Sequence, residues 1–374
     1  MGSITNRSRR DYNSYFTDVH YRGDSGAERT SLWCILVEFI TTQAKVTIMT
    51  DLQPIIEAVR QAAVLCRAVQ DKHIAPYQHA DNDAVARKAG AEPVTIADYG
   101  AQAIICRALS RAYPEDAVIA EEGSEQFRAL ISAGDQQEIV SLIAGVLGEP
   151  VTIDQVIDWL DFGLNREAER TWVIDPIDGT KGFIALRQYV VAVGLLDADR
   201  RVVDGVMAAP GYLHGGAVFY TRSGSAFAEP LAGGPARQIQ ASQRTDPATL
   251  IALESFEKSH ASQDLMAQLR EAAGIGAARV ERIDSQEKYA RVAAGDADLY
   301  LRLPRITSTR SHMIWDHAAG TALVQAAGGV VSDVDGSPLD FSLGRTLAHN
   351  RGMIVANPRI HPRLIEAAQE LQLV

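Results

Sequence analysis

Two acidic residues stand three positions apart in the segment WVIDPIDGTKGF, at Asp175 and Asp178. Carboxylates this close repel each other when both are ionised, so either water or a bound cation must offset their charges. Asp, Pro and Gly all favour turns, and a plain turn is one interpretation of DPIDGT. The hydrophobic run TWVI before it reads as a buried strand, which favours a role for both acids at the end of that strand.

Acidic residues recur at other points where a helix or strand is expected to begin or end. They are Asp98 in PVTIADYGAQ, Glu121 in AEEGSE and Asp316 in IWDHAAG, in addition to the pair Asp175 and Asp178. Hard divalent cations such as Mg²⁺ prefer oxygen ligands, and carboxylates supply most of the compensating charge. Two such cations close together can activate a water molecule and stabilise the leaving oxygen of a phosphate ester. Carboxylates converging from separate segments would therefore suit metal-assisted hydrolysis of a phosphate ester.

Each of these acids also has a purely local interpretation. Thr95 and Asp98 have the spacing of a helix capping box, in which Asp98 would stabilise the start of a helix. Glu121 reads as a solvated loop residue, and Asp316 as an acid that favours a helix N-terminus through the helix dipole. Local spacing leaves the catalytic and the structural interpretations open.

The elements that must position these acids are predicted from hydrophobic spacing. One helix is expected after Met49, with Thr50 and Gln53 as its capping box, and a second over residues 95–113. Residues 126–170 look irregular apart from a helix at 153–160. The segment AVIA before Glu121 predicts a short strand.

Strands dominate the middle of the chain, and helices return after it. The strand segments are TWVID, YVVAVGLLD, RVVDGVMAAP and GAVFYTRSGSAF, separated by the turns DADR and RSGS. Helices are expected over residues 262–273 and from WDHAAG to the stop at Gly328 and Gly329. This interleaving predicts an α+β or layered α/β fold.

Bulk composition restricts the partners of the chain. A net charge of -11 over 374 residues argues against nucleic acid, whose phosphates attract Lys and Arg. No apolar run approaches the roughly 20 residues of a membrane span. Cys34, Cys66 and Cys106 lack the spacing of a metal site, and so few cysteines suit a reducing cytoplasm. A small-molecule substrate in the cytoplasm is the expectation.

The chain is long enough for two subdomains. Residues 1–48 are polar and aperiodic, and we leave them unassigned as an N-terminal extension expected to be disordered. Residues 49–230 would form an α+β subdomain that carries most of the acids. Residues 231–374 would form a second, α/β subdomain.

Three motifs together carry a resemblance to a known family. DPIDGTKGF resembles the signature of the lithium-sensitive, magnesium-dependent phosphatases, which include inositol monophosphatases and fructose bisphosphatases. AEEG is similar to the G-E-E segment of that family, with Ala120 in place of a glycine, and WDHAAG is similar to its second signature, W-D-x-A-A-G. The motifs occur in the family's order. The resemblance implies a layered αβαβα sandwich of the inositol monophosphatase type.

The resemblance also implies roles for individual residues around two or three Mg²⁺ ions. The implied metal ligands are Glu121, Asp175, the carbonyl of Ile177, Asp178 and Asp316, with Asp98 at a third ion. Thr180 and Asp98 would position and deprotonate the attacking water. The backbone amides around Gly179 and Thr180 would hold the phosphate at a helix start.

Segments in the second half resemble a narrower group, the 3'(2'),5'-bisphosphate nucleotidases. They are EKSH, DSQEKY, YLRLP and PLDFSLGRTL. Such enzymes remove the 3'-phosphate of adenosine 3',5'-bisphosphate (PAP) to give AMP. By this resemblance Lys288 and Arg302 would bind the second phosphate, Ser285 would donate a hydrogen bond and His260 would face the adenine. Without it, His260 reads as a surface histidine and Lys288 as a solvated helix charge.

Two other functions remain as alternatives. An inositol monophosphatase or inositol polyphosphate 1-phosphatase would share the metal chemistry but would need no adenine contact. A non-catalytic nucleotide sensor on the same fold would be expected to have lost a metal ligand. The sulfated analogue of PAP is a further possible substrate, and lithium inhibition is expected from the family resemblance.

Overall fold

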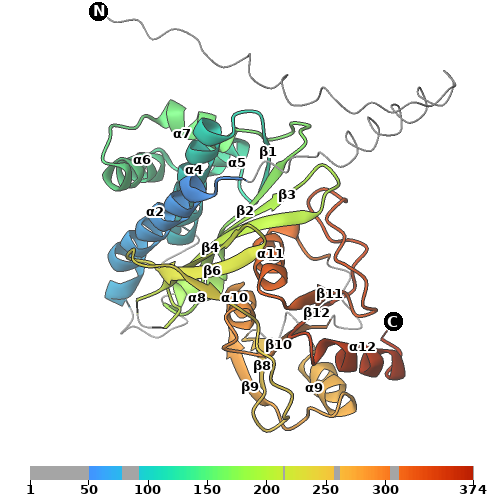
Figure 1. Cartoon of the computed structure of the whole chain (residues 1–374). Helices are drawn as coiled ribbons and strands as arrows, with labels where there is room; N and C mark the ends of the chain where they lie inside the picture. The colour runs from blue at the N-terminus through green and yellow to red at the C-terminus, as the bar shows by residue number, and fades with distance from the viewer. Residues whose placement is uncertain (1–49, 78–91, 214, 257–261, 304–310, 374) are drawn as a thin grey trace, which may run out of the picture. The chain divides into compact units, whose positions relative to one another are not determined.

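Two mixed β-sheets and the helices packed on them make up the part of the chain that the computed structural model describes (Figure 1). The described residues are 50–77, 92–213, 215–256, 262–303 and 311–373. The chain divides at residue 50, and the fold below concerns the unit Asp51–Val374. Within the described residues, no helix combines the length and apolar character needed to span a bilayer.

Among the described residues, the first sheet contains seven strands in the order of the sequence. They are β1 (Ala117–Ala120), β2 (Thr171–Asp178), β3 (Val190–Leu196), β4 (Val202–Ala209), β5 (Ala217–Arg222), β6 (Ser225–Pro230) and β7 (Arg237–Ile239). The strands β1 and β2 are parallel, and each later neighbour is antiparallel. The sheet thus extends past residue 230, where the boundary between the two subdomains was predicted. The division into two subdomains stays a prediction.

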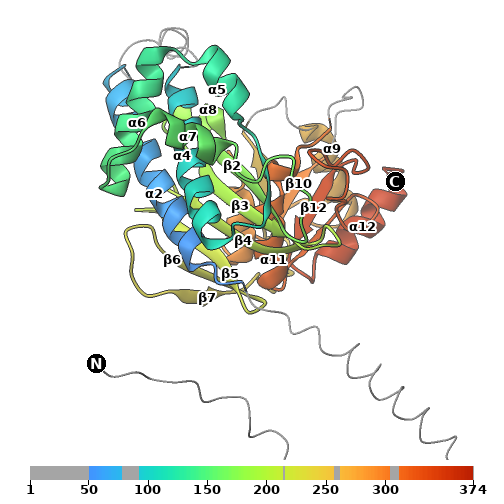
Figure 2. The same cartoon turned by 90° about the horizontal axis from the view of Figure 1, so that it is seen from above.

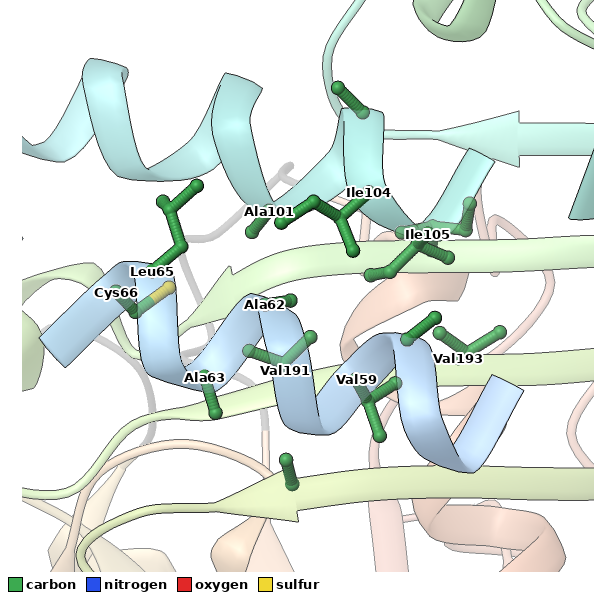
Figure 3. Packing of buried hydrophobic residues seen from close by; sticks show 14 of the residues in the cluster. Val59, Ala62, Ala63, Leu65, Cys66, Ala101, Ile104, Ile105, Val191 and Val193 are labelled. Carbon is green, nitrogen blue, oxygen red and sulfur yellow. The ribbon is translucent and has the colours of Figure 1, made fainter. Parts of the chain in front are cut away.

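Both faces of this sheet are covered. Successive side chains of a strand point to opposite faces, so each strand contributes to a core on either side. On β3, Val191 and Val193 join the hydrophobic core under α2 (Gln53–Val69) and α4 (Glu92–Ala112). Val190 and Ala192 of the same strand join the core on the other face. Figure 3 shows α2 and α4 side by side, with β3 behind α2.

Over the ranges that the structure describes, the second sheet contains five strands in the order β11-β12-β10-β8-β9. Their bounds are β8 (Ile251–Ser255), β9 (Arg279–Ile283), β10 (Leu299–Arg302), β11 (Val330–Ser332) and β12 (Met353–Ala356). Strands β8, β9 and β10 run parallel, so their carboxyl ends share one edge of the sheet. Strand β12 runs antiparallel to β10 and β11.

Two helices separate the sheets, and two more cover the outer face of the second sheet. The inner pair is α10 (Glu287–Ala293) and α11 (Ala318–Ala326), whose buried residues share one core with both sheets. The outer pair is α9 (Gln263–Ala272) and α12 (His361–Glu370). The order of layers is helices, sheet, helices, sheet, helices, as Figures 1 and 2 show. The predicted αβαβα sandwich is confirmed.

Helix α11 lies unusually close to the first sheet because two glycines face it. Gly194 on β3 pairs directly with Gly205 on β4. A Cβ atom at Gly194 would lie 2.7 Å from the Cβ of Ala318, and one at Gly205 would lie 2.6 Å from the carbonyl oxygen of Ala319. The absence of these side chains sets the depth of α11, and Asp316 stands two residues before that helix.

The prediction that residues 126–170 are largely irregular is wrong. This stretch contains most of α5 (Ser124–Leu130), all of α6 (Ala133–Leu147) and α7 (Ile153–Leu160), the last as predicted. Ser132 caps α6 by accepting a hydrogen bond from the backbone NH of Asp135, and the left-handed Gly148 ends it. These capping signals are present in the sequence but were outweighed by the stretch's weak hydrophobic periodicity.

The predicted capping box at the first helix and the predicted start of the second helix are also wrong. Helix α2 follows Leu52, and the backbone NH of Gln53 donates to the side chain of Asp51 instead of Thr50. Helix α4 begins at Glu92, three residues before the expected start. The remaining short helices are η1 (Gln70–Ile74), η2 (Ala75–Tyr77), α8 (Thr180–Ile184) and η3 (Ile314–Asp316).

Candidate functional site

A bulge in β2 turns Asp175 and Asp178 to the same side of the first sheet. Asp175 pairs with Ala192 on β3, whereas Asp178 pairs with Val190, so three positions on β2 oppose two on β3. In a regular strand, residues three apart would point to opposite faces. The extra residue in the segment that contains Pro176 removes this difference, and bulges commonly redirect side chains near functional sites. Both carboxylates therefore lie on the face that carries α10 and α11.

Glu121 reaches Asp175 because β1 and β2 are parallel. Their register pairs Ala120 with Ile174, and the backbone NH of Glu121 continues the ladder by donating to the carbonyl of Ile174 at 3.3 Å. Glu121 is therefore the residue opposite Asp175. The carboxyl ends of neighbouring parallel strands, where ligands commonly bind in α/β proteins, thus bring these two acids together.

Gln286 connects the acid on β2 to the one before α11, and it had no predicted role although the segment DSQEKY that contains it was singled out. Its backbone NH donates to Oδ2 of Asp178 at 2.5 Å. Its buried side-chain amide donates to the carbonyl of Trp315 at 2.9 Å and accepts from the backbone NH of Gly320 at 3.1 Å. Trp315 precedes Asp316 directly, so one residue holds both acid-bearing segments.

We call Asp98, Glu121, Asp175, Asp178 and Asp316 the acid cluster. Asp175 is only 2% exposed, and its Oδ1 atom has no hydrogen-bond partner among the described residues. Burial raises the pKa of Asp175 well above its ordinary value, and the charges of the other four acids raise it further. A buried carboxylate oxygen without a partner is costly, and it is where a cation would be stabilised.

The neighbours of Asp175 show the same mutual repulsion. Burial, followed by the charges of Glu122, Asp316 and Asp178, raises the pKa of Glu121 to about 7, although part of Glu121 reaches solvent. Burial and then Asp316 raise the pKa of Asp178 to about 6. Burial and then Glu121 raise the pKa of Asp98. Perturbed carboxylates gathered in this way are typical of functional sites.

Asp98 lies inside α4 and not at its start. The helix begins at Glu92, so the interpretation of Asp98 as the partner of Thr95 in a capping box is wrong. Asp98 is buried, and after burial itself the charge of Glu121 is the largest cause of its raised pKa. The structure therefore leaves Asp98 with a place in the acid cluster and no capping role.

Gly179 and Thr180 form the start of the short helix α8 directly after Asp178. Gly179 has a φ of +93°, and a Cβ atom there would lie 2.8 Å from the Cβ of Ser285, so only glycine suits this position. The hydroxyl of Thr180 donates to the carbonyl of Ile177 at 3.4 Å. Thr180 itself is exposed beside the acid cluster.

Lys288 is buried, so its interpretation as a solvated helix charge is wrong. Its ammonium donates to the carbonyl oxygens of Ser285, at 2.6 Å, and Ile283, at 3.3 Å. Ser285 adopts a φ of +64°, which is unfavourable for a residue with a side chain, and the lysine holds its carbonyl. Burial lowers the pKa of Lys288 to about 8, although the charge of Asp178 opposes that shift.

Arg302 stands at the end of β10 and faces the acid before α11. Its Nη1 atom lies 3.7 Å from Oδ2 of Asp316 and 3.5 Å from Nε2 of His317. The other ring nitrogen of His317 shares a 2.8 Å hydrogen bond with the hydroxyl of Tyr289. Burial and the charge of Arg302 lower the pKa of His317 well below its ordinary value, so it is a neutral residue that supports Arg302.

Two further residues complete the account of the predicted site. His260, the expected adenine contact, lies outside the described residues. Arg345 had no predicted role, although the segment PLDFSLGRTL that contains it was singled out. Its guanidinium lies 4.5 Å from the ring centroid of Trp315 and donates to the backbone carbonyl of Glu121 at 3.2 Å. Arg345 thus fastens the end of β1 to the segment that carries Asp316.

Comparison with known families bears on this arrangement directly. The model of the inositol monophosphatase family matches residues 51–373. The chain belongs to the inositol monophosphatase family. Two of its relatives are named 3'(2'),5'-bisphosphate nucleotidase. The one from Oryza sativa is 37% identical over 344 residues and covers 84% of this chain and 92% of its own length. The other, nucleotidase 1 of Candida albicans strain WO-1, is 34% identical over 349 residues and covers 84% and 93%.

Solved structures of this family share the fold of the chain. The inositol monophosphatase of Thermotoga maritima matches with a TM-score of 0.55 and 19% identity, covering 85% of this chain and 96% of that one. The extragenic suppressor protein SuhB of Bartonella henselae matches with a TM-score of 0.54 and 20% identity, covering 85% and 98%. At these identities the likeness establishes the fold alone.

Proposed function

We propose that this protein hydrolyses the 3'-phosphate of adenosine 3',5'-bisphosphate, giving AMP and inorganic phosphate. The observation that carries this proposal is its similarity to several proteins named 3'(2'),5'-bisphosphate nucleotidase over most of both chains. The acid cluster supports it, because phosphate-ester hydrolysis needs several carboxylates that converge from separate segments. The sulfated analogue of PAP is a second candidate substrate of the same site.

The acid cluster is suited to Mg²⁺ by its chemistry. The residues that would hold the ions are Asp98, Glu121, Asp175, the carbonyl of Ile177, Asp178 and Asp316. When bound, divalent cations supply positive charge that polarises the phosphate ester and stabilises its leaving oxygen. Among the described residues, no group of three or more His, Cys, Asp or Glu side chains is arranged as a complete site for one ion.

The residues next to the cluster would hold the substrate and the attacking water. The backbone amides of Gly179 and Thr180 lie at the start of α8, where they would donate hydrogen bonds to phosphate oxygens. The hydroxyl of Thr180 would orient the water, and the carboxylate of Asp98 would take its proton. These roles extend the resemblance described above and remain proposals.

The second phosphate distinguishes a nucleotide bisphosphate from an inositol monophosphate. Arg302 is a cation at the carboxyl end of β10, and its planar guanidinium can bind a phosphate through two parallel hydrogen bonds. Ser285 packs against Gly179, so the segment that contains Ser285 lies next to the acid cluster. The buried Lys288 adds positive charge behind Ser285. This concentration of positive charge favours a substrate with a second phosphate over an inositol monophosphate.

Release of inorganic phosphate by the purified protein in Mg²⁺ tests the proposal, with PAP and inositol 1-phosphate compared with and without lithium. A strong preference for PAP supports it. A preference for inositol 1-phosphate would retain the metal chemistry and reject the substrate. No release from either compound would favour a nucleotide sensor, although none of the acids expected of an enzyme is missing from this chain. The cytoplasmic location stays a prediction.

A further inference from the structure

Phe256 is an aromatic residue that the fold leaves exposed at the carboxyl end of β8, the kind of position where α/β proteins commonly bind ligands. It follows the last residue of β8, and 49% of its surface is accessible to solvent. A large apolar side chain exposed in isolation is common and needs no explanation. Phe256 differs because of its neighbours, which the sequence did not identify.

The position of Phe256 is the carboxyl edge shared by three parallel strands. Ser255 at the end of β8 pairs with Ile283 at the end of β9, so Phe256 and Asp284 leave the sheet together. Continuing the register between β8 and β10 places Arg302 opposite Ser255. Ligands of α/β proteins bind at the carboxyl ends of parallel strands. Strands β8, β9 and β10 lie beside α10 in Figure 1.

A half-buried ion pair, in which only Asp284 is buried, holds one side of the Phe256 ring. The Nε and Nη2 atoms of Arg187 donate to Oδ2 of Asp284 at 3.1 and 2.9 Å, and the side chain of Asp284 is only 8% exposed. The guanidinium carbon of Arg187 lies 4.4 Å from the centroid of the Phe256 ring. This cation–π contact orients the ring, because the anchored guanidinium cannot move freely. Phe256 is therefore an aromatic surface supported from behind and open to solvent.

A continuous series of contacts connects this surface to the acid cluster. Asp284 is followed by Ser285, whose Cβ atom touches the position of Gly179. Gly179 in turn follows Asp178 directly. A ligand whose phosphate lies at Gly179 would thus extend along the segment 284–285 toward the ring.

We propose that the exposed face of Phe256 stacks on the adenine base of the substrate, with Arg187 as the residue that positions the ring. This inference rests on the proposed function and adds the part of the site that selects a nucleobase. Base stacking on an aromatic side chain depends on flat, polarisable surfaces and tolerates different bases, with purines stacking more strongly than pyrimidines. No bond is made or broken by these two residues.

The test compares two inhibitors that differ only in the base. AMP is the product of the proposed reaction, and ribose 5-phosphate is the same molecule without adenine. Inhibition constants for both are measured with the wild-type protein, Phe256→Ala, Phe256→Tyr and Arg187→Met. We expect Phe256→Ala to weaken AMP by about 5- to 100-fold, the usual range for one stacked base. Ribose 5-phosphate should change by less than about twofold, and Phe256→Tyr should bind AMP like the wild type.

The same variants separate this proposal from the proposed function. With PAP as the substrate, Phe256→Ala should raise KM and leave kcat nearly unchanged, and Arg187→Met should give a smaller rise in KM. Leu130→Ala is the control, because Leu130 is 76% exposed on α5 and does not belong to this edge. Equal AMP inhibition in Phe256→Ala and wild type would overturn the stacking proposal while PAP turnover stands. A wild type that does not hydrolyse PAP would reject the proposed function itself.

Discussion

The close approach of α11 to the first sheet makes Gly194→Ala a direct test of how the site is held. The new methyl group would lie 2.7 Å from the Cβ of Ala318, about 0.7 Å short of an ordinary contact of 3.4 Å. Backbone atoms of Ala318 and Ala319 lie at 3.0 to 3.1 Å from it, so side-chain rotation cannot relieve the overlap. The helix must move away from β3, and Asp316 would move with its N-terminal end.

Both stability and catalysis should respond to this displacement. Overpacking of a dense core costs about 1–3 kcal/mol. In a unit of this size that corresponds to a fall in melting temperature of roughly 1.5–4.5 °C. A catalytic group displaced by about 1 Å can lose about 100-fold in rate. For Gly194→Ala we therefore expect kcat with PAP to fall by about 10- to 100-fold in protein that is still folded at 25 °C.

Two further variants control this experiment. Gly145→Ala adds a methyl group to α6 where no atom lies within 4 Å, so it should leave activity unchanged and raise stability by about 0.5–1 kcal/mol. The double variant Gly194→Ala with Ala318→Gly removes the nearest clash and should recover part of the lost activity. Thermal unfolding and steady-state kinetics on the same preparations provide both measurements. Wild-type activity in Gly194→Ala would refute the idea that this glycine sets the position of Asp316.

Three other predictions follow from the acid cluster and its neighbours. Burial and Asp316 raise the pKa of Asp178 to about 6, above its ordinary value of 3.8, so in EDTA the protein should lose stability as the pH rises from about 4 to 7. Mg²⁺ should raise the melting temperature more at pH 8 than at pH 5, and equal shifts at both pH values would contradict the metal assignment. Asp178→Asn should abolish turnover, and an active variant would contradict the same assignment. Gln286→Ala should lower kcat and raise the half-saturating Mg²⁺ concentration severalfold, because both segments that it joins carry acids; an unchanged Mg²⁺ dependence would leave Gln286 a structural role only. The pKa of Lys288 is lowered to about 8, so the side chain loses its charge above that pH. The KM of the wild type for PAP should therefore rise above pH 8. In Lys288→Met the KM should be higher at lower pH and should depend less on pH.

Hydrophobic periodicity predicted the strands and several helices of the fold, whereas the order of its layers was implied by the family resemblance. Strand β3 is a continuous apolar run, which is expected of a strand buried on both faces, as shown by Val190, Val191, Ala192 and Val193. Helix α7 was predicted to its last residue, and in the structure Thr152 and Gln155 form a complete capping box at its start. Helices α5 and α6 were missed because their apolar residues are spread around more of the helix surface.

The site was predicted in its residue types and not in its geometry. Nothing local in DPIDGT indicates that the strand continues through Pro176 with a bulge, because a bulge is defined by the register of its partner strand. The burial of Lys288 depends on carbonyl groups that only the folded turn at Ser285 presents. Gln286 acts mainly through contacts with residues that are distant in sequence, so no spacing rule could select it.

The acids and the selecting residues belong to different sheets, and this has a consequence for how the family can diversify. Glu121, Asp175 and Asp178 leave the first sheet, whereas Phe256, Ser285 and Arg302 leave or follow strands of the second. Under the proposed function, a substitution at Phe256 can therefore alter which phosphorylated alcohol binds while the carboxylates on the first sheet keep their places. Such a division lets natural selection explore new substrates in small steps, each of which retains a working phosphatase.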